Sequence, residues 1–162
     1  MRILVTGNAG SGKSTVSKQL ATNYEITCYS LDKVVWQENW HKTPQKEKDR
    51  LINELIAKKD WVIDGVSNKI LEAADQIIFL DFPRRVCFYR AAKRNTRYLF
   101  SSRPELPANC PEILIIPTLF KIIWNFPKKA RPELMKEKSR RNDSFIQIKN
   151  NKELRAYLSS VR

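Results

Sequence analysis

The sequence has few of the residues that mark several protein classes. Only 4 Gly and 8 Pro occur among its 162 residues, which excludes collagen-like and low-complexity chains. The three cysteines, Cys28, Cys87 and Cys110, are widely spaced and form no CxxC pair, so we expect reduced thiols. The longest apolar stretch, residues 113–124, is too short to span a bilayer, and no secretory signal pattern opens the chain. We therefore expect a cytoplasmic protein with no membrane partner.

The remaining composition favours one folded domain that meets an anionic partner. Apolar residues make up 42% of the chain, enough for a core, and the length fits a single domain over residues 1–162. The net charge is +13, and it is unevenly distributed. Residues 1–80 carry 11 Lys and Arg against 10 Asp and Glu, whereas residues 81–162 carry 19 against 7. Such an excess indicates either nucleic acid or the phosphates of a small ligand, and composition does not choose between them.

Strands alternate with helices along the chain. The expected strands are mostly continuous apolar runs and do not alternate between apolar and polar residues, which is typical of a parallel sheet covered on both faces. We predict an α/β fold of the P-loop type with a five-stranded parallel sheet. The expected strands are residues 2–6, 25–30, 61–63, 76–80 and 145–148, and the expected helices are residues 13–23, 44–59, 84–98 and 152–161.

One long segment interrupts this alternation. Residues 100–142 hold six of the eight prolines and no strand pattern. An excursion of this length between two core elements is typical of a lid or a binding insertion. We therefore predict an inserted helical lid over about residues 98–142, mobile and docked by phosphate charge rather than by a core of its own. An acceptor-side segment is expected over about residues 30–60.

The strongest motif is a complete P-loop. The pattern Gly-x-x-x-x-Gly-Lys-Ser follows an apolar strand and precedes an amphipathic helix. Its glycines let successive backbone N–H groups point at phosphate oxygens, beside the positive end of the helix. Lys13 is expected to reach the β- and γ-phosphates, and the Ser14 hydroxyl to ligate Mg²⁺. The predicted binding loop consists of Gly7, Asn8, Ala9, Gly10, Ser11, Gly12, Lys13, Ser14 and Thr15.

Taken with later motifs, this loop resembles the adenylate-kinase-like small P-loop kinases. The motifs are Tyr-Ser-Leu-Asp-Lys at residues 29–33, Val-Ile-Asp-Gly at 62–65 and Phe-Leu-Asp-Phe-Pro at 79–83. The sequence is most similar to the bacterial group called topology modulation proteins, on its Trp36 and Trp40 pair and its Trp-Asn-Phe-Pro at residues 124–127. The resemblance covers nearly the whole chain and implies ATP and Mg²⁺ as cofactors.

The resemblance also implies roles for single residues. Asp64 matches the aspartate that helps to hold magnesium beside the P-loop. Arg90 matches the arginine that packs on adenine, and Arg94 the one directed at the phosphates. Their spacing of four places both on one helical face, with Arg97 nearby, and a guanidinium can stack on a base or bind phosphate oxygens. Such arginines would be catalytic because phosphoryl transfer needs charge neutralisation.

Asp32 follows the second predicted strand, at the sheet edge where acceptors bind in doubly wound folds. Related shikimate and gluconate kinases carry an aspartate near this position that contacts the hydroxyl to be phosphorylated. Asp32 is therefore a candidate catalytic base, and an N-cap for the following segment is the alternative. Trp36 and Trp40 either line the acceptor pocket or pack in the interior.

The sequence departs from adenylate kinases after Asp64-Gly65. Those enzymes continue with Phe-Pro-Arg, whose arginine grips the acceptor phosphate, whereas this chain continues with Val66, Ser67 and Asn68. AMP is therefore in doubt as the acceptor. Two functions remain open: an ATP-dependent kinase of an unidentified small molecule, or an ATP-gated DNA-binding regulator without kinase activity. The basic C-terminal half would bind nucleic acid weakly and non-specifically in either case.

Overall fold

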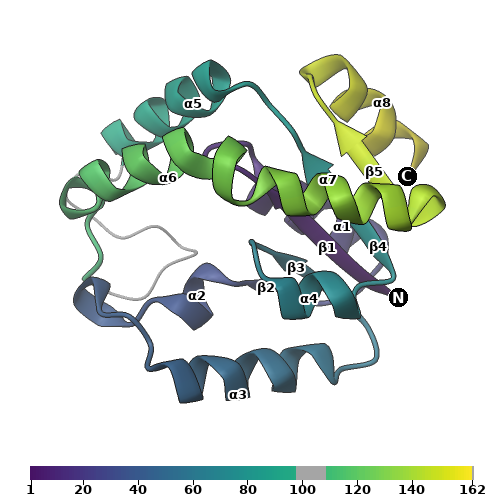
Figure 1. The fold of residues 1–162 in the computed structure, drawn as a ribbon, viewed down its shortest axis with the longest axis horizontal. Helices are drawn as coiled ribbons and strands as arrows, with labels where there is room; N and C mark the ends of the chain where they lie inside the picture. Colours follow the sequence, from purple (N-terminus) through teal and green to yellow (C-terminus); the bar gives the residue numbers. More distant parts are fainter. Residues whose placement is uncertain (98–108, 162) are drawn as a thin grey trace.

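The computed structural model describes residues 1–97 and 109–161. Its centre is one parallel sheet with the strand order β2-β3-β1-β4-β5 (Figure 1). The predicted fold class is confirmed, down to the number of strands. The strands are β1 (Arg2–Gly7), β2 (Cys28–Ser30), β3 (Trp61–Asp64), β4 (Gln76–Leu80) and β5 (Phe145–Ile148).

Helices connect the strands and cover the sheet. The α-helices are α1 (Lys13–Asn23), α2 (Asp32–Val35), α3 (Gln45–Ile56), α4 (Asn68–Ala73), α5 (Arg84–Arg97), α6 (Ile116–Lys129), α7 (Arg131–Arg140) and α8 (Asn151–Ser160). Three short 3₁₀ turns occur at Glu38–Trp40, Glu112–Leu114 and Asn142–Ser144. No helix within the described residues is both long and apolar enough to cross a lipid bilayer.

The sheet divides the hydrophobic core into two layers because successive strand side chains point to opposite faces. One layer joins Ile3 and Val5 of β1 to α1 and α8. The other joins Leu4 of β1 to α3, α4 and α7. All these strand residues are buried, which is why the strands read as continuous apolar runs.

The parallel pairing brings the carboxyl ends of four strands to one edge. Val5 lies opposite Asp64 of β3, and Gly7 lies opposite Leu80 of β4. Ser30 of β2 in turn lies opposite Asp64. The P-loop, the segment after β2 and the segment after β3 therefore start side by side.

The predicted lid is not separate from the core over its second half, and its mobility stays a prediction. Its first part, residues 98–108, lies outside the described residues. Residues 116–140 instead form α6 and α7, and these helices belong to the core: Leu119 and Ile123 join one layer, Phe126 and Leu134 the other. Helical structure was expected here, but the expected docking by phosphate charge rather than by a core is wrong for these two helices, because their apolar side chains pack against the sheet. Pro117 and Pro132 lie in the first turns of α6 and α7, where proline is tolerated.

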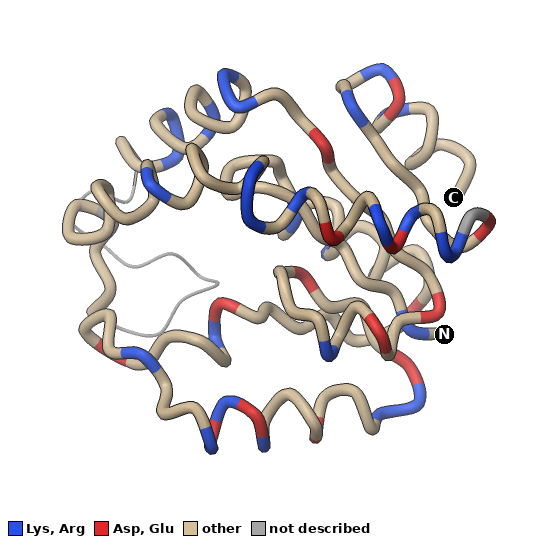
Figure 2. The backbone as a smooth tube through the Cα atoms, in the orientation of Figure 1, with Lys and Arg blue, Asp and Glu red and all other residues tan. Residues whose placement is uncertain are grey.

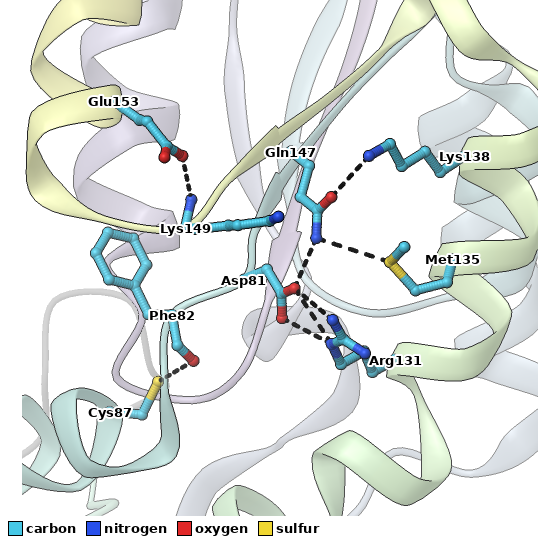
Figure 3. A network of polar contacts seen from close by, with 9 residues as sticks. All are labelled: Asp81, Phe82, Cys87, Arg131, Met135, Lys138, Gln147, Lys149 and Glu153. Carbon is cyan, nitrogen blue, oxygen red and sulfur yellow. Dashed lines mark hydrogen bonds and ion pairs between the residues drawn. The ribbon is translucent and has the colours of Figure 1, made fainter.

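A polar network fixes the start of α7 against the sheet (Figure 3). The Asp81 carboxylate, just after β4, accepts hydrogen bonds from Arg131 Nε at 3.0 Å and Nη2 at 2.9 Å. Gln147 of β5 donates to the same carboxylate at 2.7 Å and accepts from Lys138 Nζ at 2.8 Å. The hydrogen bond to Asp81 raises the pKa of Arg131 above its ordinary value. The first turn of α7 is thereby tied to two strands.

Other differences from the expected elements are small. Strand β2 begins at Cys28 rather than residue 25, because Glu25 has a φ of 55° and cannot continue an extended strand. The short helices α2 and α4 were not predicted, since four to six residues are too few to show a helical period. Cys28, Cys87 and Cys110 all lie within the described residues and form no disulfide there, in agreement with the expected reduced thiols.

Candidate nucleotide-binding site

The P-loop runs from the end of β1 into α1, and its path requires glycine at two positions. Gly10 has a φ of +77° and Gly12 a φ of +100°, both in the region that side chains disfavour. A Cβ on Gly10 would lie 2.3 Å from the carbonyl oxygen of Cys87 in α5, whereas a Cβ on Gly12 would meet nothing nearer than Arg90 Nη1 at 3.7 Å. The loop is therefore curled tightly against α5.

This path leaves the loop with unused hydrogen-bonding groups. Within the described residues, the N–H groups of Gly10, Gly12, Lys13 and Ser14 donate to no acceptor, whereas Ser11 N–H donates to Asn8 O at 3.1 Å. The Ser11 hydroxyl is buried without a partner. Unsatisfied donors grouped at a helix N-terminus bind anions. The residues present therefore fit a chain of phosphate groups.

Lys13 lies in a cluster of charged groups. Its Nζ donates to Asn8 O at 3.0 Å, within its own loop. Burial lowers the pKa of Lys13 below its ordinary value, while the carboxylates of Asp32 and Asp64 act in the opposite direction. Arg94 adds to the lowering. Three other predicted site residues, Asp32, Asp64 and Arg94, are thus near enough to Lys13 for their charges to act on its amine.

The two carboxylates of this cluster come from neighbouring strand ends. Asp64 is the last residue of β3 and is only 4% exposed. Asp32 is the first residue of α2 and is half-buried. The alternative in which Asp32 caps α2 is wrong, because Leu31 holds the N-cap position. Both carboxylates therefore remain candidates for chemistry at the P-loop.

Arg90 contacts the P-loop directly. Its Nη1 donates to Ser11 O at 2.8 Å, and its Nη2 donates to Asn151 Oδ1 at the start of α8 at 2.6 Å. Its guanidinium carbon lies 4.4 Å from the ring centroid of Phe82. One face of the guanidinium is thus covered by an aromatic ring. Arg94 is partly buried, and the Arg97 side chain lies outside the described residues.

The P-loop is also tied to α6. The Asn8 side chain is 2% exposed, and its Nδ2 donates to Ile123 O at 3.0 Å. Its Oδ1 accepts from Ala9 N–H at 2.8 Å. Both polar atoms of the Asn8 side chain therefore make hydrogen bonds within the protein, so Asn8 holds the loop in place rather than binding phosphate through its side chain.

The magnesium assignment depends on few protein ligands. The described residues contain no group of three or more His, Cys, Asp or Glu side chains that could hold a metal ion. Ser14 is the second residue of α1 and Asp64 is the last residue of β3, so the protein offers one hydroxyl and one buried carboxylate as ligands. Mg²⁺ keeps several waters and takes substrate phosphates as further ligands, so this donor set fits Mg²⁺ bound with ATP.

The basic surface extends beyond the site. In Figure 2, Lys and Arg recur along α5 and around the junction of α6 and α7, while α3 carries both signs. Neither α5 nor α6 contains an acidic residue. Arg84 of α5 lies 4.5 Å above the exposed ring of Trp124 in α6. Part of the excess positive charge of residues 81–162 therefore lies on α5 and α6, the helices that contact the P-loop.

Trp36 and Trp40 pack against each other, and Trp40 also contacts Cys110 and Pro111. Their ring centroids are 5.3 Å apart in an edge-to-face arrangement. Trp40 Nε1 donates to Pro111 O at 2.9 Å, and its backbone N–H donates to Cys110 Sγ at 3.4 Å. Both rings remain partly exposed, so the packing role is seen while a role in acceptor binding stays a prediction.

Sequence reasoning missed three residues that shape the site. Phe82 lies under Arg90, Asn151 accepts from it, and Asn150 caps α8 by accepting from two backbone N–H groups. An Asn-Asn pair one residue after the last strand is an N-cap signal that could have been recognised. Nothing in the sequence alone placed Asn151 beside Arg90, 61 residues away.

Comparisons with known proteins agree with the geometry. A family model described as an AAA domain matches residues 3–99, more than half of the chain. An adenylate kinase from Encephalitozoon cuniculi (strain GB-M1) is 29% identical over an alignment of 119 residues, and the match covers 58% of this chain. That match covers 66% of the relative, so the chain spans just under two thirds of its length.

Two solved structures share the fold. A shikimate kinase from Aquifex aeolicus has a TM-score of 0.52 at 21% identity, over 99% of this chain and 93% of the other. A shikimate kinase from Bacteroides thetaiotaomicron has a TM-score of 0.55 at 16% identity, over 99% and 96%. At these identities the two structures show the fold alone. The resemblance to the adenylate-kinase-like superfamily is confirmed by these matches, and membership of the topology modulation group stays a prediction.

Proposed function

The chain belongs to the AAA-domain family, and on that premise we propose that it is an ATP-dependent phosphotransferase acting on a small molecule with a hydroxyl group. The observation that carries the proposal is the cluster at Lys13. The charges of Asp32, Asp64 and Arg94 act on the amine of Lys13, so this site combines phosphate binding with a carboxylate for the metal and another for an acceptor. An ATP-binding switch would need phosphate binding and the metal carboxylate, but no carboxylate for an acceptor.

Each residue has a distinct task in this proposal. The free N–H groups of the P-loop and the Lys13 amine bind the phosphates, and Arg94 adds a second cation at the same place. Arg90 holds Ser11 O, and the guanidinium face that Phe82 leaves uncovered stacks on adenine. Ser14 and Asp64 would hold Mg²⁺, which would neutralise charge on the phosphate oxygens.

Asp32 acts on the acceptor. The hydroxyl oxygen forms a bond to the γ-phosphorus as the bond between that phosphorus and the bridging oxygen of ADP breaks. The carboxylate of Asp32 takes the hydroxyl proton. A carboxylate is useful for a hydroxyl acceptor and unhelpful for a phosphate acceptor, which is already ionised. The names of the fold relatives, shikimate kinases, support a small-molecule acceptor.

A coupled ADP-release assay tests this function. Wild-type protein with MgATP is screened against nucleosides, sugars, polyols and nucleotides, and Asp32→Asn is compared with Asp143→Asn, an exposed carboxylate on another surface. We expect Asp32→Asn to bind ATP normally and to lose about 10²- to 10⁴-fold in acceptor turnover, the usual contribution of a general base. Asp143→Asn should behave as wild type. Full turnover in Asp32→Asn would refute the role of this carboxylate.

The same preparations separate the kinase from the DNA-binding alternative. Retention on duplex DNA is measured with and without MgATP, over a range of salt concentrations. A kinase with a basic surface should bind DNA weakly, with strong salt dependence and no effect of MgATP. ATP-dependent DNA retention without any acceptor-stimulated ADP release would favour the switch instead.

A further inference from the structure

A pocket of about 180 Å³ lies beside the P-loop, between the start of α4 and the start of α7. These two helices lie on the same face of the sheet in Figure 1. Thr6, the residue before the first P-loop glycine, lines the pocket, and so do Ser67 and Asn68, which follow Asp64 by three and four residues. The lining of the pocket therefore includes residues next in the chain to Gly7, the first P-loop glycine, and to Gly65, which follows Asp64.

The pocket holds polar groups that the protein does not use. Thr6 is completely buried, and within the described residues its hydroxyl has no hydrogen-bond partner. Ser67 occupies the N-cap position of α4, yet its hydroxyl makes no capping bond. A buried hydroxyl without a partner is unfavourable unless a ligand or water meets it. Both hydroxyls are thus available to a bound molecule.

The other walls of the pocket are apolar, and the pocket volume limits the size of a bound molecule. The apolar walls are the buried side chains of Leu4, Leu71 and Leu134. A cavity of about 180 Å³ suits a group no larger than a monosaccharide.

One side of the pocket is closed by a pair of polar side chains. Asn68 Nδ2 donates to Glu133 Oε1 at 3.1 Å, from α4 to the first turn of α7. The Arg131–Asp81 ion pair, two residues away, fixes this turn against the sheet. Glu133 and Lys129 are the charged residues of the lining, so their charges cancel. A phosphate dianion would face the Glu133 carboxylate with a single lysine to balance it.

We propose that this pocket is the acceptor subsite and that it takes an uncharged, hydroxyl-bearing group while disfavouring a phosphorylated one. The inference rests on the proposed phosphotransferase function and names its substrate class. Hydroxyl groups of the acceptor hydrogen-bond to Thr6, Ser67 and Glu133, and its carbon skeleton packs on the leucines. Asn68, which occupies the position of an arginine in adenylate kinases, binds Glu133 instead of a phosphate.

Matched pairs of compounds test the charge preference. ADP release by the full chain is measured with glycerol and glycerol 3-phosphate, D-ribose and D-ribose 5-phosphate, and adenosine and AMP. We expect the uncharged member to be preferred by at least about tenfold in kcat/KM in the best pair. Glu133→Gln removes the repelling charge and keeps the shape, so it should reduce this preference by about tenfold. Glu72→Gln, on the exposed side of α4, should leave the preference unchanged.

Thr6 provides a second, independent measurement. Thr6→Val removes the buried hydroxyl at constant shape, so the acceptor KM should rise about tenfold while the ATP KM stays constant, and Thr6→Ser should restore the acceptor KM. A preference for the phosphorylated compounds would overturn the inference. Acceptor-stimulated release that neither Glu133→Gln nor Thr6→Val alters would also overturn it, with the kinase function intact. Absence of stimulated release with all six compounds would overturn both.

Discussion

The two strained glycines of the P-loop allow a matched test of the local geometry. Gly10→Ala and Gly12→Ala both place a side chain at positive φ, which costs about 1–2 kcal/mol for an L-residue. They differ in the space around the new methyl group. At Gly12 the nearest atom is a side-chain nitrogen at 3.7 Å, whereas at Gly10 it is the backbone oxygen of Cys87 at 2.3 Å.

The steric difference should appear in stability. A backbone oxygen within α5 cannot rotate away, so the loop must shift from the helix, and overpacking of this kind costs about 1–3 kcal/mol more. We expect Gly12→Ala to destabilise the fold by about 1–2 kcal/mol and Gly10→Ala by about 2–5 kcal/mol. Urea unfolding followed by tryptophan fluorescence measures both values.

The same shift should weaken nucleotide binding. Moving the loop from α5 breaks the hydrogen bond between Arg90 and Ser11 O, so Gly10→Ala should bind ATP less tightly than Gly12→Ala in calorimetry. Equal destabilisation and equal ATP affinity in the two variants would refute the close approach of the loop to α5.

Further predictions concern the groups around the site and one buried phenol. Arg131→Ala leaves the Asp81 carboxylate, 12% exposed, without its cation and should destabilise the fold by about 1–3 kcal/mol in urea unfolding; no change would show that the pair is not formed in solution. Arg90→Ala should weaken ATP binding more than Asn151→Ala, because only the former frees the P-loop carbonyl; calorimetry showing the reverse order would contradict this. Burial raises the pKa of Tyr157 to about 12, so the folded state keeps its phenol proton after the unfolded state has lost it, and stability falls as pH rises above 10. Relative to Tyr157→Phe, wild type should lose about 1.4 kcal/mol between pH 9 and pH 11, and parallel stability curves for the two proteins would argue against this burial.

The sheet could be predicted from sequence because its strands are buried on both faces. Continuous apolar runs such as residues 76–80 need no tertiary information to be recognised, and the observed β4 has the same bounds. The P-loop helix was equally clear, since Gly12 marks its start and the apolar spacing its length. These signals are local. A local hydrophobic pattern predicts the observed element correctly when the residues that it marks as apolar are also the ones that the fold buries.

The segment after α5 shows where such reasoning stops. Residues 116–140 contain three prolines, yet two of them lie in first turns, and the helices are held by contacts with distant strands. Whether Leu119 and Ile123 face the core or solvent depends on the position of the sheet, which no local pattern encodes. Tertiary packing therefore decided between a separate lid and a core element.

The candidate site divides in the same way. The P-loop residues and Asp64 were identified from motifs because their backbone path fixes their place. The pocket beside Thr6 was not predicted, because it combines β1 with residues of α4 and α7 that are more than 60 positions away. The contact of Arg90 with Asn151 likewise arises only when α5 and α8 pack beside the loop.

The central claim is that Lys13 binds the phosphates that are transferred. Lys13→Ala removes the amine at the centre of the charged cluster, and Lys59→Ala removes an exposed lysine elsewhere as a control. The decisive measurement is acceptor-stimulated ADP release by both variants, with ATP affinity measured by calorimetry on the same preparations. We predict that Lys59→Ala retains both properties and that Lys13→Ala loses turnover by at least about a hundredfold. Wild-type turnover and wild-type ATP affinity in Lys13→Ala would contradict the account.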